Sequence, residues 1–355
     1  MSFIHSEFEI INGQIAALNE EAAQASWAHW DSIAKPLRSL GKLEEYIVKI
    51  AALTGNPDVK LDKKLVLVLC ADNGVVCEGV TQSDSSVTAA VAQSILRHGS
   101  SVCTMGATVG ADVIPVDMGM NEAVEGTVDR HIRRGTGNIA VEPAMSLEEA
   151  KAAIMAGIDL VKTYKEQGYQ IIATGEMGIG NTTTSAALMS VFLGLPIGEV
   201  TGRGAGLSDI GLHKKHNAIK RAIQVNHPDK HNPLEVLAKI GGLDIAGMVG
   251  LFIGGAIHRV PIVIDGLISS TAALVAAAIC PACKCAMLAS HCSAEPAAKA
   301  ILDRLETDPI IMGELKLGEG TGAVCLFPLL DMALAVYNTS ASFDDISVGQ
   351  YVPQV

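Results

Sequence analysis

Tyr169-Gln-Ile-Ile-Ala-Thr-Gly-Glu-Met-Gly-Ile-Gly-Asn-Thr-Thr-Thr-Ser-Ala-Ala187 is the stretch of sequence on which our prediction of the fold rests. Its first five residues are an apolar run typical of a buried parallel strand. Glycines that permit tight turns and side chains that commonly cap a helix follow, namely Gly175, Gly178, Gly180, Asn181, Thr182, Thr183 and Thr184. The stretch therefore predicts a strand, a glycine-rich turn and the start of a helix.

Such a turn is suited to bind a phosphate group, because backbone N–H groups at a helix N-terminus and nearby hydroxyls all donate toward an anion. It is neither a Walker A loop, since no Gly-Lys-Ser/Thr closes it, nor the dinucleotide fingerprint, whose glycine spacing differs. A phosphate would repel Glu176, so we expect this acid to serve a ribose hydroxyl or a developing cation. The alternative is a turn that binds no ligand.

The composition indicates a compact α/β protein. The chain has 355 residues, 49% of them hydrophobic and 4% aromatic, with 35 glycines. This length suits one large α/β domain with a smaller appendage, or two modest domains. A net charge of −12 argues against a nucleic-acid partner. The N-terminus lacks the features of a signal peptide, so we expect a cytoplasmic protein. Charged residues interrupt the apolar segment 241–279 too often for a membrane span, so we expect buried helices and a strand there.

Four further strands are predicted, at 65–70, 113–116, 260–264 and 287–289, with helices at 88–98, 146–167 and 323–337 and two or three short helices within 13–53. The helix at 146 opens on the capping box Ser146-Leu-Glu-Glu149. The pattern predicts a doubly wound, mostly parallel sheet with helices on both faces. Residues 61–305 would form this large domain, and residues 1–60 and 306–355 a small helical one.

An acid follows four of these strands within about three residues: Asp72, Asp117, Glu176 and Asp265. Because the carboxyl ends of parallel strands meet at one edge of the sheet, we expect all four to surround a single site. A second glycine-rich turn, 202–206, and the basic pair Lys214-Lys215, which we expect to open a helix, follow the central stretch. The basic loop 130–138 is interpreted as a solvated turn rather than a substrate contact.

Eight cysteines in a cytoplasmic protein are expected to be reduced thiols. Cys280, Cys283, Cys285 and Cys292, with His291 beside them, have a metal-like spacing. No second pair completes a standard zinc pattern, so we interpret them as buried free thiols and predict no metal and no cofactor.

Taken together, several motifs resemble those of the nicotinate-nucleotide–dimethylbenzimidazole phosphoribosyltransferases, which act in assembling the lower ligand of cobamides. The motifs are Ala-Asp72-Asn-Gly-Val, Gly175-Glu-Met-Gly-Ile-Gly-Asn-Thr-Thr, Gly202-Arg-Gly-Ala-Gly, Gly242-Leu-Asp244, Ile264-Asp265-Gly, Ser290-His-Cys-Ser-Ala-Glu295 and Leu317-Gly-Glu319-Gly-Thr-Gly. The likeness covers nearly the whole chain. It implies transfer of 5-phosphoribose from nicotinate mononucleotide to an aromatic base, with release of nicotinate.

The resemblance also implies roles for individual residues. Glu319 would be the general base on the acceptor, and Glu176 would lie near the ribose or the acceptor. The phosphate and the nucleotide would be bound by Gly178, Gly180, Asn181, Thr182, Thr183, Gly204, Lys215, Ser290 and Ser293. The acceptor would contact Ser83, Val91, Met177 and Leu317. A purely structural alternative is that the Glu319 carboxylate caps the helix that follows it.

Two departures from the family pattern concern the acceptor. Asn73 stands where a histidine is common, and Val91 where a glutamine is common. A pocket with fewer polar groups suits a phenol or p-cresol, the acceptors of the family's phenol-using branch, so we expect these to be accepted as well as a 5,6-dimethylbenzimidazole-like base. The resemblance implies a dimer, either a homodimer or a heterodimer with a paralogue, and the apolar segment 241–279 would supply a pairing surface.

Three other functions would require different sequence features. A nicotinamide-dependent oxidoreductase would need the dinucleotide fingerprint after an early strand, which is missing. A diphosphate-dependent phosphoribosyltransferase would need two adjacent acids for Mg²⁺, and the strand at 260–264 is followed by one. A non-catalytic paralogue, which binds nucleotide or supports a partner chain, is the serious rival. The presence of Glu176 and Glu319 counts against it.

Overall fold

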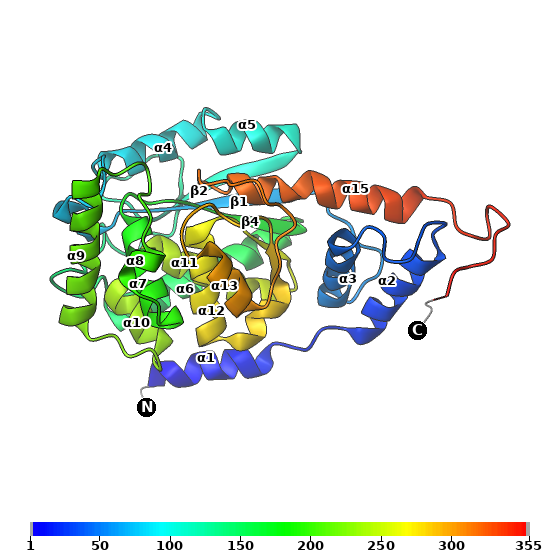
Figure 1. Cartoon of the computed structure of the whole chain (residues 1–355), viewed down its shortest axis with the longest axis horizontal. Coiled ribbons are helices and arrows are strands. Elements are labelled where there is room, and N and C mark those ends of the chain that lie inside the picture. Colours follow the sequence, from blue (N-terminus) through cyan, green and yellow to red (C-terminus); the bar gives the residue numbers. More distant parts are fainter. Residues whose placement is uncertain (1–2, 353–355) are drawn as a thin grey trace.

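The protein is built on a six-stranded parallel sheet with the order β3-β2-β1-β4-β5-β6 (Figure 1). The computed structural model describes residues 3–352, with side chains from residue 7 onward. The strands are β1 (Lys64–Ala71), β2 (Ala111–Gly119), β3 (Val128–Asp129), β4 (Ile171–Met177), β5 (Ile262–Ile264) and β6 (Met287–Ala289). The chain winds outward from β1 in one direction and from β4 in the other, which confirms the predicted doubly wound fold.

Two layers of helices enclose the sheet, each with its own hydrophobic cluster. The first cluster is built with α1 (Phe3–Gln14), α6 (Leu147–Glu166), α7 (Asn181–Leu193), α8 (Ile197–Val200), α9 (Asp209–Asn226), α10 (Pro233–Ile240), α11 (Leu243–His258), α12 (Leu267–Ile279), the short 3₁₀ helix η2 (Pro281–Ala286) and α13 (Ala298–Leu305). The second is built with α2 (Glu20–Ser32), α3 (Lys42–Thr54), α4 (Ser86–Leu96), α5 (Ser101–Thr108), α14 (Thr321–Val324) and α15 (Leu326–Thr339). A further 3₁₀ helix, η1 (Gly74–Glu78), follows β1.

The central strand β1 shows how the sequence produces this sandwich. Its side chains alternate between the clusters, so that Leu65, Leu67 and Leu69 face the first and Val66 and Val68 face the second, all without exposed surface. A parallel strand covered on both faces is apolar at every position rather than at every second one. This explains why the run at 65–70 has no polar alternation.

Several predicted boundaries were too short. β4 continues past the predicted end at Ala173 through Gly175-Glu176-Met177, and β2 runs from Ala111 to Gly119. Both strands continue because β1 pairs with them along its whole length, with Leu69 opposite Glu176 and Cys70 opposite Asp117. The two-residue strand β3 was not predicted, and α9 begins at Asp209, so the two lysines lie within it instead of opening it. The capping box of α6 is confirmed.

The apolar segment 241–279 is the interior of the subunit. In α11 every residue from Leu243 to Ala256 is buried, and α12 is buried from Leu267 to Ala276. The expectation that this segment supplies a pairing surface was therefore wrong, because its apolar residues cover the sheet and α6. The predicted dimer itself stays a prediction.

A small group of helices extends from one end of the sheet, where α2, α3 and α15 pack together (Figure 1). Helix α1 lies apart from them against η2, so the N-terminal helices do not form one unit. The 19-residue stretch Thr321–Thr339 is apolar and long enough to cross a membrane, yet 56% of its 18-residue apolar window is buried inside the protein. Asp331 in it forms an ion pair with Lys64 at 3.1 Å, which fits a core helix.

Glycines allow α6 and α11 to touch backbone to backbone. A Cβ atom added to Gly250 would lie 2.0 Å from the Ile154 carbonyl oxygen. We expect Gly250→Ala to lower the free energy of unfolding by about 3 kcal/mol, the upper range for overpacking a close contact. Gly198→Ala is the matched control, because its added Cβ would meet no atom within 4 Å. Urea titrations check this, and equal stability of the two variants would contradict it.

Candidate active site

A cavity of about 270 Å³ opens at the carboxyl ends of β4 and β5. Its walls come from the turn after β4, the loop after β5, the second glycine-rich turn and the loop before α14. The structure brings most of the sequence-predicted site residues together there: Ser83, Glu176, Met177, Gly178, Gly180, Asn181, Thr182, Gly204, Ser293, Leu317 and Glu319 line it.

Four predicted site residues do not line the cavity. Thr183 and Ser290 are fully buried behind the wall, where the Ser290 hydroxyl donates to the Ile264 carbonyl at 2.6 Å. Val91 is half-buried on α4 and packs against the second hydrophobic cluster. Lys215 reaches the cavity edge from α9, because its Nζ donates to Thr182 Oγ1 at 2.9 Å and to the Gly202 carbonyl at 3.0 Å.

The two glycine-rich turns meet at the N-terminus of α7. Gly180 caps this helix in a left-handed conformation with φ 96°, and a Cβ atom added to Gly204 would lie 3.3 Å from Thr182 Oγ1 and 3.8 Å from Lys215 Nζ. Burial lowers the pKa of Lys215 to about 8. Backbone N–H groups, a threonine hydroxyl and a lysine thus converge on one spot, which is suited to an anion.

Glu319 is held in a strained loop. Its φ is 59°, a left-handed conformation that non-glycine residues seldom adopt, and Gly318 and Gly320 on either side have φ 93° and 92°. The buried Asp265 carboxylate stabilises the loop, since it accepts from the backbone N–H of Gly320 at 3.2 Å and of Ala323 at 2.9 Å. Such strain persists where the surroundings enforce it, so the loop geometry points to a function for Glu319.

The Glu319 carboxyl group has a free oxygen within reach of the cavity. Its Oε2 is buried without a hydrogen-bond partner, and the side chain lines the cavity. Burial raises the pKa of Glu319. Helix α14, which follows Glu319, has Gly320 at its N-cap and no side-chain cap, so the alternative that Glu319 caps this helix was wrong.

Glu176 is a second acid on the cavity wall. It shares a hydrogen-bond donor with a third acid, Asp244, which the sequence-based prediction of site residues missed. The Asn181 side-chain amide donates to Glu176 Oε2 and, at 2.8 Å, to Asp244 Oδ2. Burial and the nearby Asp244 raise the pKa of Glu176 to about 8, and burial raises that of Asp244 to about 6. The sequence feature that could have identified Asp244 is an acid in the first turn of an otherwise apolar helix.

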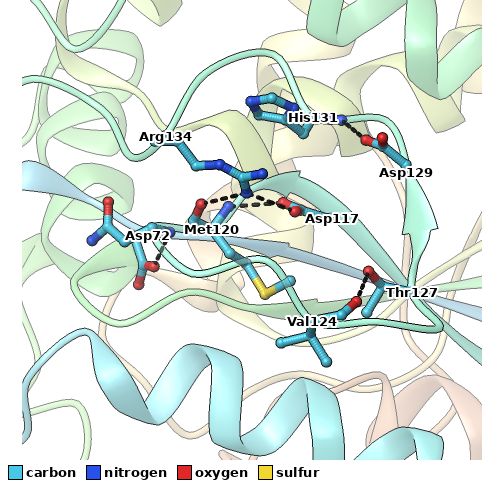
Figure 2. Close-up of polar contacts among 9 residues, drawn as sticks. Asp72, Asp117, Met120, Val124, Thr127, Asp129, His131 and Arg134 are labelled. Atoms are coloured by element: carbon cyan, nitrogen blue, oxygen red, sulfur yellow. Dashed lines mark hydrogen bonds and ion pairs between the residues drawn. The ribbon is translucent and has the colours of Figure 1, made fainter.

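The four acids that follow strands do not surround one site. Glu176 and Asp265 line the cavity, but Asp72 and Asp117 lie farther along the sheet edge. Figure 2 shows Arg134 joined to Asp117 and to the Met120 carbonyl, both at 3.0 Å, and Asp72 Oδ2 accepts from the Asn121 N–H at 2.7 Å. These two acids and the basic loop hold the backbone after β2 in place, and no residue of loop 130–138 lines the cavity.

The cysteine cluster packs as separate thiols. Cys280 and Cys283 have no exposed surface, and the Cys280 thiol donates to Asn12 Oδ1 of α1 at 3.5 Å. Within residues 3–352, no three histidine, cysteine or acidic side chains converge in an arrangement that would hold a metal ion.

Comparison with known proteins assigns this site to a family. A model of a family described as "Phosphoribosyltransferase" matches residues 15–348. The chain belongs to this family. It is thus an enzyme of the glycosyltransferase type, as the sequence motifs predicted.

Relatives resemble the chain over nearly its whole length. Two proteins named nicotinate-nucleotide–dimethylbenzimidazole phosphoribosyltransferase are similar to it. The one from Ruminiclostridium cellulolyticum is 44% identical, with 98% of this chain and 99% of the relative covered. The one from Halalkalibacterium halodurans is 38% identical, with 97% of each covered. A crystal structure described as CobT from Thermus thermophilus superimposes with a TM-score of 0.87 at 36% identity, covering 93% of this chain and all of that one.

The raised pKa of Glu176 predicts a pH-dependent stability for the free protein. Between pH 4.5, the ordinary value, and about 8, the folded state holds a proton that the unfolded state has released, so the free energy of unfolding falls as pH rises. Glu176→Gln cannot ionise, and we expect it to flatten this fall between pH 6 and 8. Urea titrations at three pH values check this, with the exposed Glu125→Gln as control. Parallel slopes for wild type and Glu176→Gln would contradict it.

Proposed function

We propose that the protein transfers 5-phosphoribose from nicotinate mononucleotide to a benzimidazole-type base such as 5,6-dimethylbenzimidazole, giving an α-ribotide 5′-phosphate for cobamide synthesis. The observation that carries this is one cavity with an anion cradle, from Gly178 to Thr182 with Lys215, and a strained carboxylate, Glu319, with an unpartnered oxygen. The names of the similar proteins support the substrate pair.

Each of these groups has its own role in the proposed reaction. The 5′-phosphate binds at the α7 N-terminus, and its charge offsets the cost of burying the Lys215 ammonium group. Glu319 accepts the proton of the base as a ring nitrogen attacks the ribose C1′. The C1′–N bond to the pyridinium breaks with its electron pair going to the ring, so nicotinate leaves without needing a proton. Positive charge developing on the ribose favours the ionised form of Glu176.

The acceptor is placed beside Glu319 by neighbouring apolar side chains. Met177 and Leu317 line the cavity next to the two acids, and Ser83 adds a hydroxyl. The sequence argument for a phenolic acceptor rested largely on Val91, which packs into the second cluster rather than the cavity wall. We therefore propose a benzimidazole-type acceptor and treat a phenol or p-cresol as the competing substrate in the assay.

Glu319→Gln is the direct test of the general base. We expect its rate of nicotinate release with dimethylbenzimidazole to be about 10²-fold lower, the usual effect of losing such a group, with nucleotide affinity retained. Glu314→Gln is the matched control, because Glu314 also has positive φ, lies in the same loop and does not line the cavity. Chromatographic detection of the ribotide checks the result. Near-normal turnover by Glu319→Gln would refute its role, and exclusive use of phenols would refute the acceptor.

The phosphate assignment predicts a substrate preference that depends on Lys215. We expect nicotinate riboside, which lacks the phosphate, to react with a kcat/KM about 10²-fold or more below that of the nucleotide, since remote binding energy contributes to the rate. Lys215→Ala should lose most of this preference by slowing the nucleotide reaction alone. Lys214→Ala, which changes an exposed neighbour, should keep it. An undiminished preference in Lys215→Ala would place the phosphate elsewhere.

A further inference from the structure

His291 follows β6 and lines the cavity, but neither the motifs nor the proposed reaction gives it a role. The side chain is 3% exposed. A parallel bridge to Ile311 fixes its backbone, and its Nδ1 lies 3.0 Å from the Ser290 hydroxyl oxygen. A buried imidazole in the wall of an active site is held in one orientation, so its two nitrogens have separate roles.

The hydrogen bonds of Ser290 determine which nitrogen carries the proton. The Ser290 hydroxyl is 2.6 Å from the Ile264 carbonyl, which can only accept, so the single hydroxyl proton points there. Its oxygen must then accept at 3.0 Å from His291, whose Nδ1 therefore bears the hydrogen. Burial lowers the pKa of His291, which keeps the ring neutral near pH 7. The other nitrogen, Nε2, is left with a lone pair.

Packing places Nε2 beside a residue that lines the cavity. A Cβ atom added to Gly322 would lie 2.2 Å from Nδ1 and 2.1 Å from Cε1, so the ring rests directly on this glycine. Nε2 lies 3.7 Å from the corresponding Cβ position of Gly266, which lines the cavity. The neighbouring acid Asp265 is already occupied by the backbone N–H groups of the Glu319 loop. His291 Nε2 is thus an acceptor that a ligand on this wall can use.

The chemistry of the nucleotide identifies the group that an acceptor would bind. A phosphate dianion, a carboxylate and a quaternary pyridinium nitrogen offer no hydrogen to donate, whereas the two ribose hydroxyls do. We propose that His291 Nε2 accepts a hydrogen bond from a ribose hydroxyl of nicotinate mononucleotide and so orients the sugar for attack at C1′. This inference rests on the proposed function and assigns a substrate-positioning residue within that same site.

Two substitutions separate the nitrogens of His291. In His291→Asn the amide nitrogen can replace Nδ1 toward Ser290 but nothing replaces Nε2, whereas in His291→Gln the longer side chain places an amide group near the position of Nε2. Each variant and the wild type are assayed with nicotinate mononucleotide and with its 2′-deoxy and 3′-deoxy analogues. We expect one analogue to react about tenfold more slowly in the wild type, the scale of one hydrogen bond.

We expect His291→Asn to lose the preference of the wild type for the nucleotide over one of the two deoxy analogues. His291→Asn should use the nucleotide and that one analogue at equal rates, His291→Gln should recover part of the preference, and the other analogue should affect all three proteins alike. The inference is overturned if His291→Asn discriminates against both analogues as the wild type does. Absence of any transfer from the nucleotide in the wild type would instead overturn the proposed function itself.

A second measurement uses the unaltered protein. The ¹⁵N chemical shifts of the His291 ring, assigned by comparison with His291→Asn, report which nitrogen carries the hydrogen. We expect a protonated Nδ1 and an unprotonated Nε2 at pH 7 in the free protein. A hydrogen on Nε2 would contradict the inference without reference to catalysis.

Discussion

The hydrogen bonds from the Glu319 loop to the Asp265 carboxylate are the interaction on which the site depends. Asp265 stands directly after β5, and its two oxygens accept from the backbone of Gly320 and Ala323, more than 50 residues later in the chain. The loop also lies on β4, since a Cβ atom at Gly175 would come within 2.5 Å of the Glu319 carbonyl. Hydrogen bonds from backbone N–H groups stabilise a buried carboxylate, so Asp265 fixes the place of Glu319, the proposed general base, without a part of its own in the proposed reaction.

Electrostatics explain why so many acids can surround a site for an anionic substrate. The proposed phosphate cradle is built on α7 and α9, whereas Glu176 and Asp265 line the cavity after β4 and β5 and Asp244 lies behind Asn181. Burial raises the pKa values of all three, but only that of Glu176, at about 8, lies above neutral pH, so Glu176 is the acid that stays protonated in the free protein. In the proposed reaction, a neutral Glu176 limits repulsion of the nucleotide, and cationic charge developing on the ribose favours its ionised form.

The sequence was sufficient to predict the fold class and much of the cavity wall, because both depend on local pattern. A strand, a glycine turn and a helix cap follow one another within 169–187. Parallel strands end at the same edge of the sheet, so an acid at the end of such a strand lies at that edge. Contacts between distant segments could not be predicted in this way. Asp72 and Asp117 follow strands as Glu176 does, but Arg134 and the backbone after β2 occupy them.

Asp244 and His291 were not predicted as site residues, again because contacts between distant segments could not be predicted. Both stood within quoted motifs, yet the properties that matter come from partners far away in sequence: Asn181 for the first, and the Ile264 carbonyl, reached through Ser290, for the second. Glu319 was selected as a lone acid between glycines, and the structure supplies the physical reason for that arrangement. Its positive φ requires flexible neighbours, and the strain is tolerated because the Asp265 carboxylate and strand β4 hold the loop from two sides. The following helix, α14, has no side-chain cap, and Glu319 keeps a buried oxygen without a partner. The loop is therefore not held in place to let Glu319 cap that helix, which argues that the position of this carboxylate is itself what the two contacts maintain.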